Sequence, residues 1–169
     1  MDQPELRLSD CPTAEVSVVI AATPRAVWPL VSDIQLPARF SSEFQGAEWL
    51  DGAPGPSLGA RFKGRNHHPA RGEWETTSTI CEYQPERQFG WAVGSPEFPA
   101  ARWRFDLEPQ AAGETRLTQW VQLGPGPSGI SYVIESMPHK ESRILRRRLA
   151  EHQANMQATI AGIKNLAET

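Results

Sequence analysis

The sequence predicts an α+β fold in which a curved antiparallel sheet of about seven strands packs around one long C-terminal helix. Three observations support this prediction. A segment rich in β-branched residues lies at 14–21, after the polar N-terminal residues. Apolar and polar residues alternate with period two between turn residues over 46–123, and an amphipathic helical stripe follows residue 138. We expect a single domain over 1–169, with a flexible tail at 1–12.

The first strand, at 14–21, passes into a helical region at Thr23 and Pro24. Threonine is a good N-cap. Proline suits the first helical position because the N–H that it lacks would have no hydrogen-bond partner within the helix there. Pro29 and Pro37 should limit helix extension. The pattern predicts two short helices after the first strand, over 24–32 and 36–41.

The middle of the chain alternates aromatic or β-branched residues with polar ones between Gly, Pro and Asp turns, which is typical of consecutive antiparallel strands. In the clearest segment Trp103, Phe105 and Leu107 should share one buried face. The predicted strands cover 46–51, 59–67, 71–84, 87–94, 100–109 and 114–123.

The C-terminal helix should begin near Pro138, because an interior proline costs about 3 kcal/mol. Residues 131–137 then form a separate turn or short helix. The apolar stripe of the long helix recurs at spacings of three and four and consists of Leu145, Leu149, His152, Met156, Ile160, Ile163 and Ala167. This stripe should pack on the apolar face of the sheet.

Composition narrows the class of protein. The net charge of −3 and the pI near 5.8 do not favour nucleic-acid binding. No run of about 18 apolar residues and no signal-peptide pattern occurs, so we expect a cytoplasmic protein without stable membrane insertion. Cys11 and Cys81 lie far apart in the sequence and should be ordinary reduced thiols.

The order of predicted elements is similar to that of the START-like (SRPBCC) superfamily. The segment 22–33, ATPRAVWPLVSD, resembles the strand-to-helix segment of its polyketide cyclase/dehydrase-like branch. Phe62-x-Gly64-x-Asn66, followed by Trp74, Pro85 and Trp91, also resembles bacterial members of that branch. The resemblance covers roughly 14–167 and implies the helix-grip fold, in which the sheet grips the last helix.

The resemblance further implies that a small hydrophobic or aromatic molecule binds between the sheet and the C-terminal helix. An enzyme of this branch would be a cofactor-free cyclase or dehydratase, but no residue here is identified as catalytic. The chain lacks GxSxG, and neither cysteine has a recognisable base beside it. The alternatives are a non-catalytic lipid or quinone carrier and a packed protein-interaction domain. A homodimer is compatible with the sequence.

Candidate ligand-binding residues are polar groups among aromatic walls on the expected inner face. For each aromatic residue alone, ordinary core packing is the simpler interpretation, and only the cluster indicates a cavity. His152 is either a hydrogen-bonded core residue or a polar group facing the ligand. The candidates are Phe62, Asn66, Trp74, Thr76, Ser78, Trp91, Trp103, Phe105, Gln119, His152 and Met156.

Other motifs favour structural roles. A formal GxGxxG at 124–129 contains Pro125 and Pro127, which remove the backbone donors that a dinucleotide needs, so we expect a rigid loop at the rim of the cavity and no cofactor. The four histidines, His67, His68, His139 and His152, lack metal-ligand spacing, and adjacent His67 and His68 should face opposite ways. His139, near the helix start, is a weak pocket candidate. Glu73 and Glu75, and the basic run of Lys140, Arg143, Arg146, Arg147 and Arg148, should be solvated.

Overall fold

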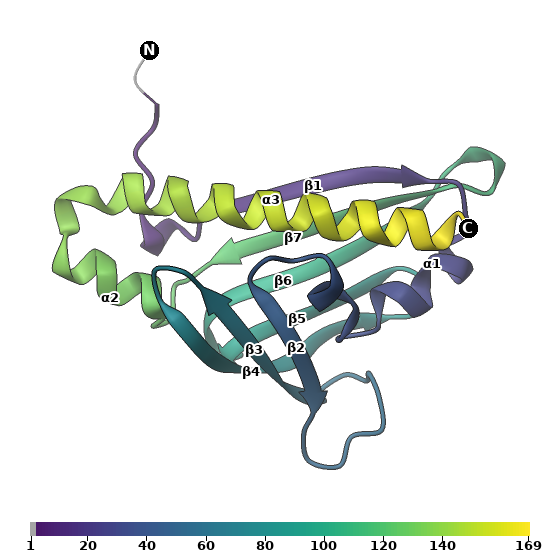
Figure 1. Ribbon diagram of the computed structural model, residues 1–169, viewed down its shortest axis with the longest axis horizontal. Helices are drawn as coiled ribbons and strands as arrows, with labels where there is room; N and C mark the ends of the chain where they lie inside the picture. Colours follow the sequence, from purple (N-terminus) through teal and green to yellow (C-terminus); the bar gives the residue numbers. More distant parts are fainter. Residues whose placement is uncertain (1–2) are drawn as a thin grey trace.

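One seven-stranded antiparallel sheet forms the frame of the protein in a computed structural model that describes residues 3–169 (Figure 1). The strand order is β1-β7-β6-β5-β4-β3-β2, so the first strand joins the last and the others follow as a meander. The strands are β1 (Thr13–Ile20), β2 (Phe44–Trp49), β3 (Arg61–His68), β4 (Gly72–Gln84), β5 (Gln88–Ser95), β6 (Phe98–Pro109) and β7 (Thr115–Leu123).

The helices lie on the concave face and at the ends of the sheet. The long helix α3 runs beside β1 and packs chiefly against β1 and β7 (Figure 1). The α-helices are α1 (Pro24–Val31), α2 (Gly129–Ser136) and α3 (Glu141–Ala167), and the 3-10 turns are η1 (Leu8–Asp10), η2 (Leu36–Arg39), η3 (Ala111–Gly113) and η4 (Pro138–Lys140). The predicted helix-grip architecture is confirmed.

The core lies where the α3 stripe meets the inner face of the sheet. Leu145, Met156 and Ile163 are at most 1% exposed, and Leu117 and Val121 of β7 are fully buried. Burying such side chains stabilises the fold by about 1.5–3 kcal/mol each. The predicted stripe therefore forms the main contact between the helix and the sheet.

Helix α1 agrees with the prediction to within one residue and includes Pro29, since one lost backbone hydrogen bond is offset by complete burial of Val27 and near-complete burial of Val31. The start of β2 differs from the sequence prediction. Strand β2 begins at Phe44, two residues before the predicted start, and its pairing with β3 shifts register between Phe44 and Gly46. An irregularity of this kind interrupts the period-two alternation on which the prediction relied, and two successive residues of β2, Gly46 and Ala47, are buried.

The segment before β1 was predicted as a flexible tail over 1–12, of which residues 1–2 lie outside the described part. Within the described part, the Leu6 N–H donates to Ser142 Oγ at 3.0 Å and the Leu8 N–H donates to Glu141 Oε1 at 2.8 Å. The segment thus lies against the first turn of α3. Of the helices within residues 3–169, not one combines the length and the apolar character needed to cross a membrane.

Candidate functional site

A cavity of about 490 Å³ lies between the inner face of the sheet, α3, the start of α2 and the segment around η2. This volume is within the range of small-molecule sites, which is roughly 300–1,000 Å³. Every residue predicted to bind ligand lines it. The cavity also contradicts the alternative of a fully packed interior.

Aromatic side chains from four strands form the floor of the cavity. The Trp91 ring centroid lies 5.7 Å from that of Phe62 and 6.2 Å from that of Phe105. Phe62 and Phe105 are buried, whereas Trp74, Trp91 and Trp103 are half-buried and line the space. The cluster therefore serves both as core and as cavity wall, so the two interpretations of these residues do not exclude each other.

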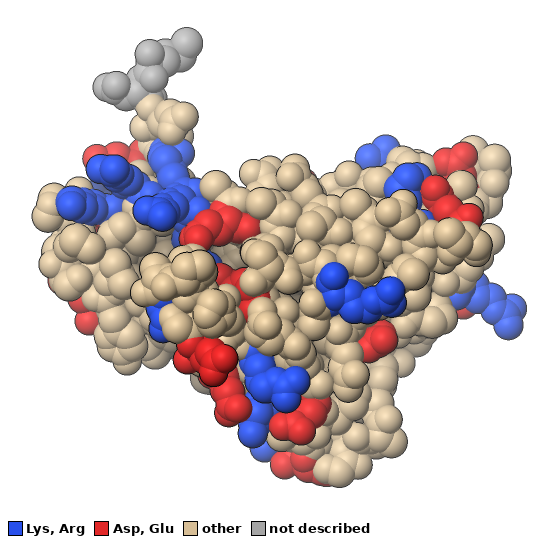
Figure 2. Space-filling model, viewed as in Figure 1, with Lys and Arg blue, Asp and Glu red and all other residues tan. Residues whose placement is uncertain are grey.

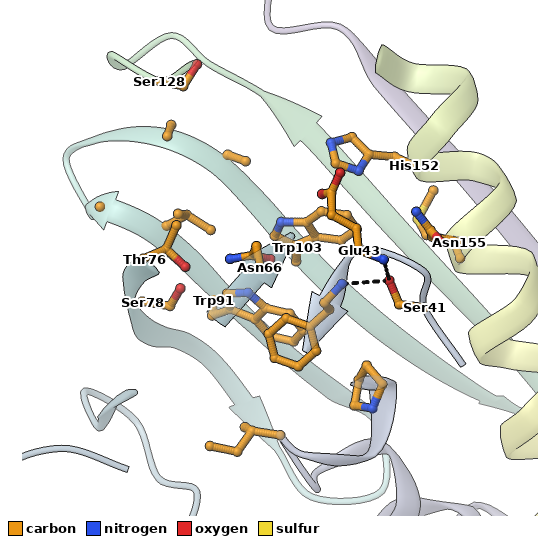
Figure 3. A pocket seen from close by; sticks show the side chains of 18 of the residues that line it. Ser41, Glu43, Asn66, Thr76, Ser78, Trp91, Trp103, Ser128, His152 and Asn155 are labelled. Carbon is orange, nitrogen blue, oxygen red and sulfur yellow. Dashed lines mark hydrogen bonds between the residues drawn. The ribbon is translucent and has the colours of Figure 1, made fainter. Parts of the chain in front are cut away.

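Polar groups interrupt this apolar wall. Asn66, Thr76 and Ser78 project from β3 and β4 (Figure 3), where alternation places them on the inner face beside the aromatic rings. Gln119 on β7 is 5% exposed, and within residues 3–169 its Oε1 has no hydrogen-bond partner. An unpaired buried acceptor costs about 1–3 kcal/mol, so Gln119 favours a ligand or a water that donates a hydrogen bond in the cavity.

His152 reaches down from α3 toward Trp103 (Figure 3), and the two rings meet edge to face with centroids 4.9 Å apart. Burial, together with the positive charges of Arg148 and Arg71, lowers the pKa of His152 to about 3. The imidazole is therefore neutral at physiological pH and offers one donor and one acceptor. The side chain is buried and also lines the cavity, so the core position and the cavity-facing position predicted for His152 do not exclude each other.

The prediction of a solvated basic run is wrong for Arg148. Its guanidinium makes a bidentate ion pair with Glu43, with Nη1 2.6 Å from Oε1 and Nη2 2.8 Å from Oε2, and both side chains are only 12% exposed. Arg148 lies one helical turn before His152 and so shares the inward side of α3. Arg143 and Arg147 are exposed, and basic side chains gather over that end of the helix (Figure 2).

A second set of contacts, hydrogen bonds that the sequence did not predict, holds the loop before β2 against α3. Ser41 Oγ accepts from the N–H groups of Glu43 and Phe44 at 3.1 and 3.0 Å (Figure 3). Asn155 Oδ1 accepts from the Ser42 N–H at 2.9 Å. These contacts position Glu43 at the cavity. The Ser41 and Asn155 spacing carries no motif, so only the folded arrangement reveals their role.

The loop at 124–129 has the structural role predicted for it. The Gly126 N–H donates to Pro99 O at 2.8 Å, which fixes the loop to β6. Pro127, Ser128 and Gly129 line the cavity, confirming the predicted rim.

Apart from Glu75, the remaining histidine and glutamate candidates do not line the cavity. His67 is exposed while His68 turns to α3, where its Nε2 lies 2.5 Å from Glu151 Oε2. The pocket candidate His139 is wrong, because it is exposed on η4 and does not line the cavity. Glu73 and Glu75 are exposed as predicted, although Glu75 borders the cavity. Among the described residues, no three histidine, cysteine or acidic side chains gather closely enough to hold a metal.

Comparisons with known proteins agree with this geometry. A family profile described as polyketide cyclase/dehydrase and lipid transport matches residues 12–157. The polyketide cyclase-like protein Cgl2372 of Corynebacterium glutamicum is 33% identical, with 92% of this chain and 91% of that one covered and a TM-score of 0.62. The Zhui aromatase/cyclase of Streptomyces sp. R1128 shares the fold at 16% identity, covering 90% and 93%, with a TM-score of 0.61. No curated protein sequence matches the chain.

Proposed function

The chain belongs to the polyketide cyclase/dehydrase and lipid transport family of the START-like superfamily, and we propose that it binds a small, mainly aromatic molecule in the cavity between the sheet and α3. The observation that carries this proposal is the pairing of an aromatic floor with Gln119, whose buried Oε1 lacks a donor among the described residues. A ligand that bears a hydroxyl or N–H group would satisfy that acceptor while its rings pack on the floor.

Binding is better supported than acid–base catalysis. The lowered pKa of His152 makes its imidazole a weak base at neutral pH. Both carboxylate oxygens of Glu43 are engaged by Arg148. A cyclase or dehydratase built on this cavity would therefore depend on holding its substrate in a reactive shape, which is a positional contribution. A carrier would release the same molecule unchanged.

Native mass spectrometry of gently purified protein tests for a bound molecule directly. A matched assay tests the proposed role of Gln119. We expect the neutral probe N-phenyl-1-naphthylamine to bind saturably, and 2-naphthol to displace it about tenfold more effectively than naphthalene, because only the naphthol donates a hydrogen bond.

The Gln119→Leu variant should lose the preference for naphthol while it still binds the probe. Gln122→Leu, three residues along β7 and pointing to the other face, is the control and should keep the preference. Failure of the probe to bind the wild-type protein would refute the proposal. Equal displacement by naphthol and naphthalene would refute the role of Gln119.

A further inference from the structure

Arg71 stands where the cavity meets solvent. It is the last residue of the turn between β3 and β4, where its N–H donates to His68 O at 3.0 Å. The residue is exposed and yet lines the cavity, so it lies at the opening. Its guanidinium carbon lies 4.1 Å from the centroid of the Trp74 ring, an arrangement that holds the side chain over the aromatic wall.

The start of α2 closes the other side of this guanidinium. A β-carbon at Gly129 would overlap the Arg71 guanidinium, so the absence of a side chain at Gly129 lets the guanidinium lie against the start of α2. The first turn of α2 adds the positive partial charge of a helix N-terminus at the same point. Arg71 is thus held between a tryptophan face and a helix start, in a place where an anion would be stabilised.

The neighbouring acidic side chains are already engaged. Glu43 pairs with Arg148, and Glu151 lies 2.5 Å from His68 Nε2 and 3.7 Å from Arg148 Nη1. Glu75 pairs with Lys63 on the outside at 3.7 Å. Among the described residues, no carboxylate lies within ion-pair distance of Arg71. Loss of hydration, followed by the charge of Arg148, lowers the pKa of Arg71, but a guanidinium stays charged at neutral pH.

We propose that the ligand of this cavity is an amphipathic acid, whose rings pack on the aromatic floor while its anionic group is held by Arg71 at the opening. This inference rests on the proposed function and adds the chemical class of the ligand. A planar guanidinium can donate two parallel hydrogen bonds to a carboxylate or sulfonate, and the Trp74 face limits its motion before binding. Gln119 would accept a hydrogen bond from a donor group on the part of the molecule that lies inside the cavity.

Two fluorescent probes of the same skeleton test the proposal. 1-Anilinonaphthalene-8-sulfonate carries a sulfonate that N-phenyl-1-naphthylamine lacks, and the sulfonate stays ionised across the neutral range. In Arg71→Gln we expect the affinity for the sulfonate probe to fall about tenfold, the lower end for a hydrogen bond to a charged group, because the site is open to water. The affinity for the neutral probe should be unchanged.

Matched variants separate this site from general attraction of anions. Arg147→Gln removes an exposed charge from the basic end of α3 and should leave both affinities unchanged. Arg71→Lys should restore part of the sulfonate affinity, since it keeps the charge but loses the planar donor pair. Mutual displacement of the two probes would place them in one cavity.

The outcomes distinguish this inference from the proposed function. If Arg71→Gln weakens both probes equally, or weakens neither, the anion site is refuted while the apolar cavity stands. If neither probe binds the wild-type protein, the proposed function fails and the anion site fails with it. A selective loss of the sulfonate probe in Arg71→Gln, with Arg147→Gln unaffected, supports the inference.

Discussion

The buried imidazole of His152 should make the stability of the protein depend on pH in a way that one substitution removes. In the unfolded chain a histidine has a pKa near 6.5, whereas in the folded protein the pKa of His152 is about 3. Below pH 6.5, His152 therefore binds a proton in the unfolded state but not in the folded state, and the free energy of unfolding falls as the pH is lowered. Above pH 6.5 both states are neutral and the contribution vanishes.

The size of this effect follows from the pKa difference. Each pH unit between the two pKa values costs up to about 1.4 kcal/mol, so lowering the pH from 7 to 5 should remove about 2 kcal/mol of unfolding free energy. His152→Phe keeps an aromatic ring edge-on to Trp103 and carries no titratable group. The variant should lose about 2 kcal/mol less than the wild type over the same pH interval.

Urea unfolding of both proteins at pH 7 and pH 5 measures this difference. The carboxylates and the other histidines contribute to both proteins, so their effects cancel in the comparison between variant and wild type. NMR should also show that the His152 ring does not titrate between pH 7 and pH 5. An equal loss of stability in the two proteins, or a ring that titrates near pH 6.5, would contradict the assigned burial and its electrostatic cause.

Two further predictions test the elements that shape the cavity. Glu43→Gln removes the carboxylate that pairs with the Arg148 guanidinium at two oxygens, and urea unfolding should show a loss of about 1–3 kcal/mol. Glu48→Gln, which removes an exposed partner 3.8 Å from Lys63, should cost less than about 1 kcal/mol. Gly162→Ala would drive a β-carbon into the Phe40 ring, so the melting temperature should fall although alanine favours a helix. In a protein that already carries Phe40→Ala, adding Gly162→Ala should no longer lower the melting temperature. An undiminished fall relative to Phe40→Ala alone would refute the steric explanation.

The fold was predictable because each element carries a local signal. Thr23 accepts from the Ala26 N–H at 3.2 Å as the predicted N-cap, and alternation placed Trp103 and Phe105 on the inner face. The family resemblance in the sequence is likewise confirmed by the matching profile. The charged part of the site was not predictable, since Glu43 and Arg148 are separated by more than one hundred residues and form a pair only after folding.

The curvature of the sheet explains why a single helical stripe has two functions. Helix α3 rests on β1 and β7, while the strands from β6 to β2 curve away from it (Figure 1). Some stripe residues, such as Ile163, are buried away from the cavity, whereas His152 also borders the space left by the curvature. Periodicity identifies the stripe but not the depth of the sheet opposite each position. A polar residue on such a stripe therefore indicates a candidate site. Burying a polar side chain is costly unless a cavity, an ion pair or a ligand supplies that side chain with partners.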